Sequence, residues 1–263
     1  MKIEVLVAAM NQTDYSLVDK MKITTDVIVG NQCDKNEIVE LKRGNNSVRY
    51  LSFNERGVGL NRNNTLMRSN GDILLFADDD MVYEENYEQV VLEAFQQNPD
   101  ADVLIFNIKE AVQTRYIIKK KFRVKWHNFM RFGAVRIAVK RKSIQEKGIF
   151  FNLCFGGGAK YAHGEDTLFL SDCLKKRLKI YAIPKTIAEL VDIRESTWFE
   201  GYDDKYFRDT GVLYRAMSNY FGNLLCLQDA IRHQNMYKRK WTEVCKLMWE
   251  GQREDKWFDI EEN

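Results

Sequence analysis

The stretch that most constrains the fold of this chain runs from residue 71 to 81, with the sequence GDILLFADDDM. Its apolar run, Ile73 to Ala77, lacks the alternation of a half-exposed strand, and such a run is typical of a strand buried on both faces. The run leads directly into Asp78, Asp79 and Asp80. Because open α/β folds bind ligands at the carboxyl edge of the sheet, the stretch predicts an acidic ligand site at that edge.

The three adjacent carboxylates indicate a bound cation. Acids this close repel one another unless a cation or hydrogen-bond donors compensate their charge. Mg²⁺ and Mn²⁺ take oxygen ligands and are often shared with substrate phosphates. We therefore expect Mn²⁺ or Mg²⁺ as the cofactor. The alternative that this stretch alone leaves open is a strand followed by a solvated acidic turn.

The first part of the chain alternates between strand-like and helix-like segments. Strands are expected at 2–9, 26–30 and 48–53, with polar and helical segments between them. This alternation is typical of parallel βαβ units. We expect an α/β fold over residues 1–190, with a mostly parallel, Rossmann-like central sheet flanked by helices. Residues 191–263, rich in aromatic side chains, are expected to form a C-terminal helical segment packed on that domain.

Composition and charge exclude some functional classes. The formal net charge of +2 nominates no nucleic-acid partner. Five cysteines are scattered without a Cys-x-x-Cys pair, which argues against a disulfide framework and a zinc site and favours a reducing cytosol. No window offers the long uncharged apolar run of a membrane span. We therefore expect a soluble protein, or one attached to a membrane surface.

Two further stretches carry residues suited to a binding site. Arg56 and Arg62 stand where a loop enters a predicted helix, and guanidinium groups beside a helix N-terminus favour anionic phosphates. The triplet Gly156–Gly158 permits close approach of the backbone to a ligand. Glu165 and Asp166 follow at the start of another predicted helix, where capping of that helix is the alternative role.

In this order, these features resemble the family 2 glycosyltransferases, which are inverting sugar-transfer enzymes of the GT-A fold. The resemblance covers residues 2–190 and rests on the first strand opening onto Asn11, the loop Arg56–Asn63, the Gly-Asp-x₅-Asp-x-Asp block at Gly71–Asp80, and Gly-Glu-Asp at Gly164–Asp166. The small bacterial members that build surface polysaccharides are the most similar.

The resemblance implies a reaction and a setting for it. A sugar would move from a nucleoside diphosphate sugar to a hydroxyl of a glycan or lipid-linked acceptor. The helical segment 191–263 would lie on the acceptor side. The reaction would take place in the cytoplasm, at the inner face of the plasma membrane where such acceptors are found.

The resemblance also implies roles for individual residues. Asp166 is expected to act as the general base on the acceptor hydroxyl, with Glu165 as its supporting neighbour, in one inverting displacement. Asp78 and Asp80 are the expected metal ligands, with His163 as the candidate third ligand. The residues expected to bind the nucleotide are Ala9, Asn11, Asn31, Arg56, Arg62, Asp78 and Asp79. The residues expected to line the donor and acceptor pocket are Gly156, Gly157, Gly158 and Trp198.

One departure from the family pattern concerns the nucleotide base. The family usually has an acid at the end of the second strand that contacts the uracil ring. This chain has Gly30-Asn31-Gln32 at that place, and Asp34 comes later. Asn31 offers an amide donor and acceptor instead. We keep a uridine nucleotide as the expected donor.

Two other interpretations stay open at this point. A nucleotidyltransferase also uses carboxylate-bound metal, although it usually has a Gly-rich signature and a basic residue after the first strand, which residues 8–11 lack. A non-enzymatic RNA- or lipid-binding module would use the basic, aromatic-rich stretch 115–142 and leave both acidic clusters unused. The basic and aromatic segment 231–249 also suits peripheral contact with an anionic membrane, for which a core-packing helix is the alternative.

Overall fold

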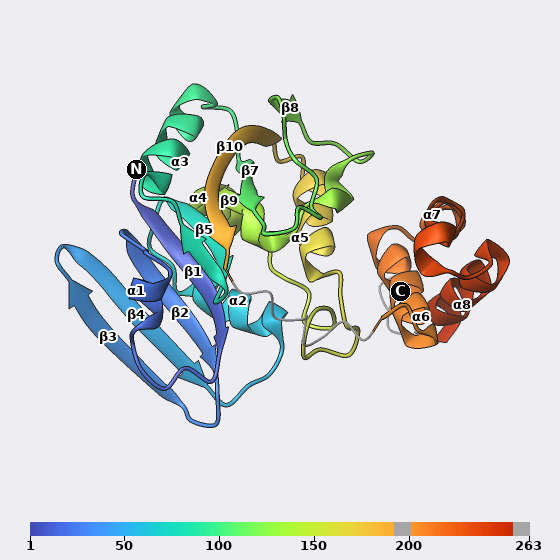
Figure 1. Ribbon diagram of the computed structural model, residues 1–263, viewed down its shortest axis with the longest axis horizontal. Helices are drawn as coiled ribbons and strands as arrows, with labels where there is room; N and C mark the ends of the chain where they lie inside the picture. Colours follow the sequence, from blue (N-terminus) through green and yellow to red (C-terminus); the bar gives the residue numbers. More distant parts are fainter. Residues whose placement is uncertain (192–200, 255–263) are drawn as a thin grey trace.

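The computed structural model describes residues 1–191 and 201–254, which form a ten-stranded sheet covered by helices and a C-terminal group of helices (Figure 1). The strands are β1 Ile3–Met10, β2 Asp26–Gln32, β3 Glu37–Arg43, β4 Asn46–Phe53, β5 Ile73–Asp78, β6 Met81–Tyr83, β7 Val103–Lys109, β8 Phe122–Arg123, β9 Ile137–Lys140 and β10 Ile180–Leu190. The helices are α1 Leu17–Lys20, α2 Val58–Met67, α3 Tyr87–Gln97, α4 Arg141–Glu146, α5 Glu165–Lys175, α6 Asp204–Met217, α7 Gly222–Tyr237 and α8 Trp241–Glu254, with short 3₁₀ turns η1 Phe129–Arg131 and η2 Ala134–Arg136.

The sheet is mostly parallel at its centre. Its strand order is β3-β4-β2-β1-β5-β9-β7-β10-β6, and β8 pairs with β10. Strands β4, β2, β1 and β5 form a run of four strands that are parallel to one another, and β10 is parallel to β7. Strands β3, β9, β6 and β8 are antiparallel to the strands with which they pair. The expected α/β fold is therefore confirmed, whereas the sequence pattern does not predict which strands reverse direction.

Strand β5 is buried on both faces, as its uninterrupted apolar run predicts. Every side chain from Ile73 to Ala77 is at most 1% exposed. Leu74 and Phe76 belong to the hydrophobic core on one face, together with residues of α5 and the C-terminal helices. Leu75 and Ala77 belong to the core on the other face, together with residues of α1 and α3. Because neither face meets solvent, the sequence of this strand has no reason to alternate.

Strand β3 has no clear signal in the sequence. It lies at one end of the strand order and pairs with β4 through a turn in which Gly44 has a φ of +58°. All but one of its residues are exposed. An edge strand with solvent on both faces buries little apolar surface, so it leaves no hydrophobic period, and its charged side chains discourage pairing with other chains.

The C-terminal helices α6 and α8 cross with their backbones in close contact. A Cβ on Gly211 of α6 would overlap the carbonyl of Met248, and a Cβ on Gly251 of α8 would overlap the carbonyl of Arg208. Glycine at both positions removes the side chains that would hold the helices apart. Figure 1 shows these helices as a group beside the sheet, at the red end of the colour scale.

This helical group contacts the loop that leads into α5. The backbone N–H of Ala162 donates to Asp209 Oδ2 at 3.0 Å, and the side chain of Leu213 packs against Gly164. The division into two domains and the acceptor-side role of the helices stay predictions. In the part of the chain that the structure describes, no helix combines the length and apolar character needed to cross a membrane. Membrane contact through residues 231–249 also stays a prediction.

Candidate active site

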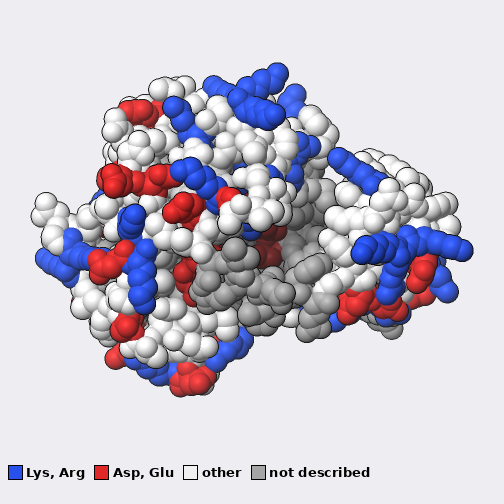
Figure 2. Space-filling view, viewed as in Figure 1, with Lys and Arg blue, Asp and Glu red and all other residues white. Residues whose placement is uncertain are grey.

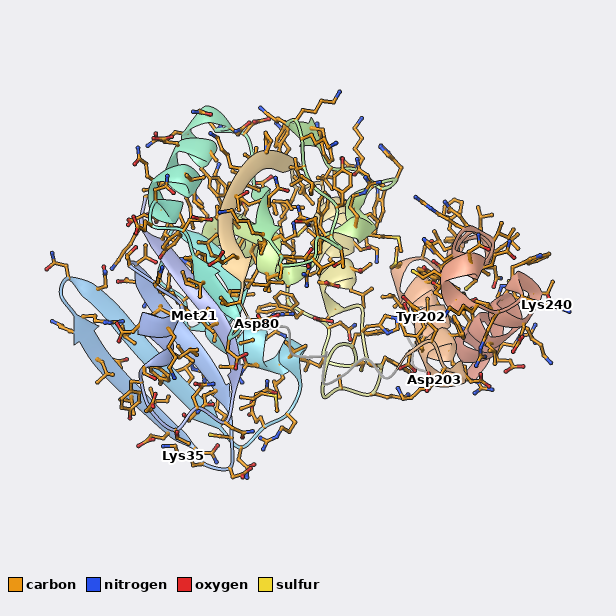
Figure 3. All side chains as sticks on the ribbon, viewed as in Figure 1. Met21, Lys35, Asp80, Tyr202, Asp203 and Lys240 are labelled. Atoms are coloured by element: carbon orange, nitrogen blue, oxygen red, sulfur yellow. The ribbon has the colours of Figure 1, made fainter. Side chains whose placement is uncertain are left out.

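The three acids lie in the turn that joins β5 to β6, at the predicted edge of the sheet. Asp78 ends β5 beside Ala8 of the parallel strand β1. Strand β10 holds the turn in place, because β6 pairs with its end and the N–H of Val191 donates to the carbonyl oxygen of Asp80 at 3.1 Å. Figure 3 shows Asp80 near the centre of the molecule.

Asp80 has a carboxylate whose charge is poorly compensated in the described part of the chain. Its Oδ1 atom is buried and has no hydrogen-bond partner in the described ranges. Burial, followed by the charges of Asp78 and Asp79, raises the pKa of Asp80 to about 6. The ionised form of such a carboxylate is stabilised when a positive charge binds beside it. Asp80 therefore fits a metal ligand.

Arg62 joins this acidic turn to the start of α5. Its side chain is only 4% exposed, and its Nη2 and Nη1 atoms donate to Asp78 Oδ1 and Glu165 Oε1, each at 2.8 Å. Burial lowers the pKa of Arg62, but Asp78 and Glu165 outweigh that effect and raise the pKa above its usual value. The prediction that Arg62 contacts the nucleotide stays untested. The structure shows an internal link between β5, α2 and α5 that the sequence does not predict.

Asp166 stands in the first turn of α5, beside this link. Its Oδ1 atom accepts a hydrogen bond from the N–H of Thr167 at 2.6 Å. Burial, then the charge of Glu165, raises the pKa of Asp166 to about 7, although the guanidinium of Arg62 lowers it. The two acidic clusters predicted from the sequence are therefore brought together by Arg62. The two clusters sit on separate elements. In the second cluster, the pKa of Asp166 is suited to proton transfer near neutral pH.

The glycine triplet packs against the N-terminal end of α2 and against Glu165. Gly156 and Gly158 have φ angles of +99° and +79°, in the left-handed region that favours glycine. A Cβ on Gly156 would lie 2.6 Å from Val58 Cγ1 and 2.8 Å from Glu165 Oε2. The triplet thus holds Glu165 in place. Its predicted contact with the donor sugar stays a prediction.

The start of α2 differs from the phosphate site that the sequence suggested. The N–H of Gly57 donates to Gln32 Oε1 at 2.8 Å, and the N–H of Val58 donates to the carbonyl oxygen of Gly157 at 2.9 Å. Protein oxygens therefore accept hydrogen bonds from these two N–H groups, and the predicted contact of Arg56 with the nucleotide stays a prediction. Arg56 pairs with Asp34 at 2.8 Å, which ties this loop to the end of β2.

Alanine at Gly156 is expected to destabilise the protein by about 2 kcal/mol more than alanine at Gly148. Both glycines have positive φ angles, but a Cβ on Gly148 would meet nothing within 4 Å. The loss of stability in the Gly148 variant therefore measures backbone strain alone. The additional loss in the Gly156 variant measures the collision with Val58 and Glu165. Urea unfolding of the two variants measures it. Equal losses of stability would mean that the loop shifts freely and does not position Glu165.

Asn31 and Asn11 have structural partners that the sequence does not reveal. Asn31 is buried, and its amide donates to the carbonyl oxygen of Gln12 at 3.0 Å and to Ser52 Oγ at 3.1 Å, while its Oδ1 accepts from the N–H of Gln12 at 2.9 Å. The amide predicted to contact the base thus holds the loop after β1. Asn11 is exposed in that loop with a φ of +52°, and Ala9 is buried inside β1.

Gln12 is a polar residue near the acids that the sequence interpretation missed. Its side-chain amide donates to Asp79 Oδ2 at 3.3 Å and to the carbonyl oxygen of Met10 at 3.0 Å. It therefore connects the loop after β1 with the acidic turn. A lone glutamine in a polar loop carries no sequence signal that would have identified it.

His163 points to partners on α6. Its Nε2 lies 3.0 Å from Thr210 Oγ1, its ring stacks on Tyr206 with centroids 4.6 Å apart, and burial lowers its pKa. Within residues 1–191 and 201–254, no group of three or more His, Cys, Asp or Glu side chains could hold a metal ion. The third-ligand role of His163 thus lacks geometric support. Trp198, predicted to line the pocket, lies outside the described residues.

A donor set of two carboxylates still suits Mg²⁺ or Mn²⁺. These ions are commonly bound through one or two carboxylates, with substrate phosphates and water completing the coordination. Asp78 and Asp80 are the residues that would hold the ion, and Asp80 Oδ1, which has no hydrogen-bond partner among the described residues, is an atom that could ligate it. The requirement for metal stays a prediction.

Comparison with known proteins gives one family and one fold. The family model described as "Glycosyl transferase family 2" matches residues 8–154, a range that includes the acidic turn and ends before Asp166. No curated protein matches the sequence. The role of Asp166 therefore depends on its geometry and on the resemblance of Gly164–Asp166 to the family pattern.

Among solved structures, S. aureus TarS is similar in fold. TarS 1-349 in complex with UDP-GlcNAc has a TM-score of 0.61 and 14% identity, with 98% of this chain and 93% of that chain covered. The complex with UDP has a TM-score of 0.60 and 13% identity over the same shares. A longer TarS structure has a TM-score of 0.61 and 16% identity, with 89% of this chain covered but only 44% of that chain. The present chain thus spans less than half of the longer protein.

Proposed function

The chain belongs to glycosyl transferase family 2, and on this premise we propose that it transfers a sugar from a nucleoside diphosphate sugar to an acceptor hydroxyl, with inversion. Its sheet and flanking helices have the GT-A arrangement. The observation that carries the proposal is the position of Arg62, which pairs with Asp78 at the end of β5 and with Glu165, the neighbour of Asp166. The nucleotidyltransferase and binding-module interpretations do not fit the family.

The donor would bind at the acidic edge of the sheet. We propose a uridine diphosphate sugar, because TarS, which is similar in fold, has been solved with UDP-GlcNAc and with UDP. Asp78 and Asp80 would hold Mn²⁺ or Mg²⁺ there. When bound, such an ion neutralises negative charge on the leaving nucleoside diphosphate. Arg62 bonds to Asp78 on one side and to Glu165, the neighbour of Asp166, on the other. This arrangement supports a donor site next to the proposed base.

Asp166 would take the proton of the acceptor hydroxyl. The acceptor oxygen attacks the anomeric carbon from the side opposite the diphosphate, the bond to the diphosphate oxygen breaks, and the proton passes to the carboxylate. With a pKa of about 7, Asp166 is mostly ionised above neutrality and can accept that proton. Arg62 contributes by limiting the rise in the pKa of Asp166 and by holding Glu165 still.

Asp80→Asn is expected to abolish metal-dependent binding of UDP. Wild-type protein should bind UDP at least tenfold more tightly with Mn²⁺ than with chelator, because an ion held by Asp78 and Asp80 would neutralise negative charge on the diphosphate. The variant loses that difference and keeps its fold, since an unpartnered buried carboxylate is removed. Isothermal titration calorimetry measures the affinities.

The matched control is Asp72→Asn, which neutralises an acid just before the other end of β5. This variant should bind UDP as the wild type does. Equal affinity of the wild type with Mn²⁺ and with chelator would contradict the metal proposal. If the affinities differ as expected, a hydrolysis screen over nucleotide sugars with Mn²⁺ would identify the donor sugar.

We also propose a glycan or lipid-linked acceptor of surface polysaccharide synthesis, and action in the cytoplasm at the membrane face. Support comes from exposed apolar side chains around α7 and α8. Tyr220, Phe221 and Leu224 are 90%, 63% and 58% exposed, and Trp241 is 40% exposed. Aromatic and aliphatic side chains beside basic residues suit an anionic membrane surface.

A further inference from the structure

A basic groove lies on the segment before η1, outside the acidic turn. It is a depression open to solvent, with a volume of about 480 Å³. Its walls include Tyr116, Phe122, Arg123, Lys125, His127 and Arg131. None of the ion pairs formed among the described residues includes Arg123, Lys125 or Arg131. Figure 2 shows basic side chains gathered over the β8 region at the top of the view. The groove therefore offers positive charge that forms no ion pair with the acids in the described part of the chain.

The cations are presented by a segment that is anchored in the core. Val124, Phe129 and Phe132 are each at most 2% exposed and belong to the core that contains α5. The N–H of Lys125 donates to Asn128 Oδ1 at 2.8 Å, which closes a turn beneath the groove. Such anchoring means that a ligand would meet charges already in position, with little ordering required on binding.

An aromatic ring also orients one of these cations. The guanidinium of Arg131 lies over the ring of Tyr116, 4.6 Å from its centroid. Phe122 adjoins Tyr116 with ring centroids 6.4 Å apart. The groove therefore combines flat apolar faces with guanidinium and ammonium groups. Guanidinium groups bind carboxylates and phosphates through paired hydrogen bonds.

The same segment leads directly to Asp166. Turn η1 packs against α5, and Gly133 follows Arg131 by two residues. A Cβ on Gly133 would lie 3.4 Å from Asp166 Oδ2. Two residues of extended chain span at most about 7 Å. The backbone of Arg131, at one end of the groove, is therefore within about 7 Å of the residue that touches the proposed base.

The donor diphosphate has a different place. Strand β8 pairs with Tyr181 and Ala182 near the start of β10, whereas Met81, next to the acidic turn, pairs with Leu190 at its end. The stretch of β10 between Ala182 and Leu190 corresponds to roughly 25 Å of strand. Arg123 on β8 is therefore separated from the acidic turn by most of the length of β10.

We propose that the groove binds an acceptor chain bearing anionic groups, phosphate or carboxylate, and leads its hydroxyl to Asp166. Arg123, Lys125 and Arg131 bind the anionic groups, and the rings of Tyr116 and Phe122 line the path between them. This assignment rests on the proposed function, because it names the acceptor class of the same site. The proposal predicts a charged acceptor in place of a neutral glycan.

The test measures binding of labelled polyanions by fluorescence anisotropy, without any nucleotide. The probes are short-chain inorganic polyphosphate and polygalacturonate oligomers, which distinguish phosphate from carboxylate as the recognised group. The double variant R123E/K125E should bind the preferred probe at least tenfold more weakly than the wild type. Both side chains are exposed, and circular dichroism checks that the fold is intact. Arg131→Glu provides an independent variant with the same expected loss.

The control is K42E/K142E, which changes the charge equally on β3 and α4, away from the groove. This variant should bind within twofold of the wild type. Equal losses in the two double variants would overturn the proposal, as would tighter binding to RNA or to phosphatidylglycerol vesicles than to either probe. Binding of UDP with Mn²⁺ is measured separately. If the wild type binds UDP with Mn²⁺ but binds neither polyanion, the groove is rejected and the donor site stands. If the wild type binds a polyanion but does not bind UDP, the donor site is rejected and the groove stands.

Discussion

Asp166→Asn is expected to reduce sugar transfer by a factor of 10² to 10⁴ and to make the folded protein more stable at pH 8. The rate falls because an amide cannot take the proton of the acceptor hydroxyl. The stability rises because burial and Glu165 disfavour the ionised carboxylate, as its pKa of about 7 indicates. A gain in stability with a loss of activity is typical of a residue kept for function.

The pH dependence of this effect has a definite sign. The pKa of Asp166 is about 7 when folded, against an ordinary value of 3.8. Between these values the unfolded chain releases the proton while the folded protein keeps it, so the stability of the wild type falls as pH rises from about 4 to about 7. The Asp166→Asn variant does not lose stability in this way, because its amide does not titrate. Its advantage should be absent near pH 4 and on the order of 2 kcal/mol above pH 7.

Urea unfolding at pH 4, 6 and 8 measures the stabilities, and kcat/KM of the wild type should rise with pH through about 7. Asp172→Asn is the matched control on the same helix. Among the described residues, Asp172 pairs with Lys175 alone, on the surface and at 3.5 Å, so the change should stay within about 0.5 kcal/mol. Retained transfer in Asp166→Asn, or a loss of stability at pH 8, would exclude Asp166 as the base.

The acidic edge could be predicted from the sequence because its cause is local. Burial of β5 on both faces requires five consecutive apolar residues, Ile73 to Ala77, and the acids follow directly in the chain. The direction of a strand such as β9 depends on which neighbours it joins, here β5 and β7. No local pattern encodes that choice, so the antiparallel strands could not be predicted as such.

The internal partners of the polar residues could not be predicted either. Arg62 and Glu165 are 103 positions apart, and only the folded chain brings them together. From sequence, Arg62 is a basic residue in a polar helix, for which a phosphate is as good a partner as a carboxylate. Asn31 is similar, because the groups that occupy its amide belong to Gln12 and Ser52. Residue type indicates what a side chain can bind, and tertiary contacts decide what it does bind.

Arg62→Met is expected to destabilise the protein by about 3 to 5 kcal/mol, the second large effect that this site predicts. Methionine fills much of the volume but leaves Glu165, 13% exposed, and Asp78 without their cation. The charge of Arg62 also lowers the pKa of Asp166, so its removal should move the rise of kcat/KM to higher pH. Urea unfolding at pH 7.5 and a pH–rate profile measure the two effects.

Arg68→Met is the control at the end of the same helix, where the arginine is exposed and bonds to Asn64. Its cost should be below about 1 kcal/mol. Adding Glu165→Gln to Arg62→Met should recover part of the lost stability, because the uncompensated carboxylate is then neutral. A structural role alone would change stability without moving the pH profile. If Arg62→Met costs no more than Arg68→Met, the link between the acidic turn and the base is not what holds the two clusters together, and the proposed site loses its main support.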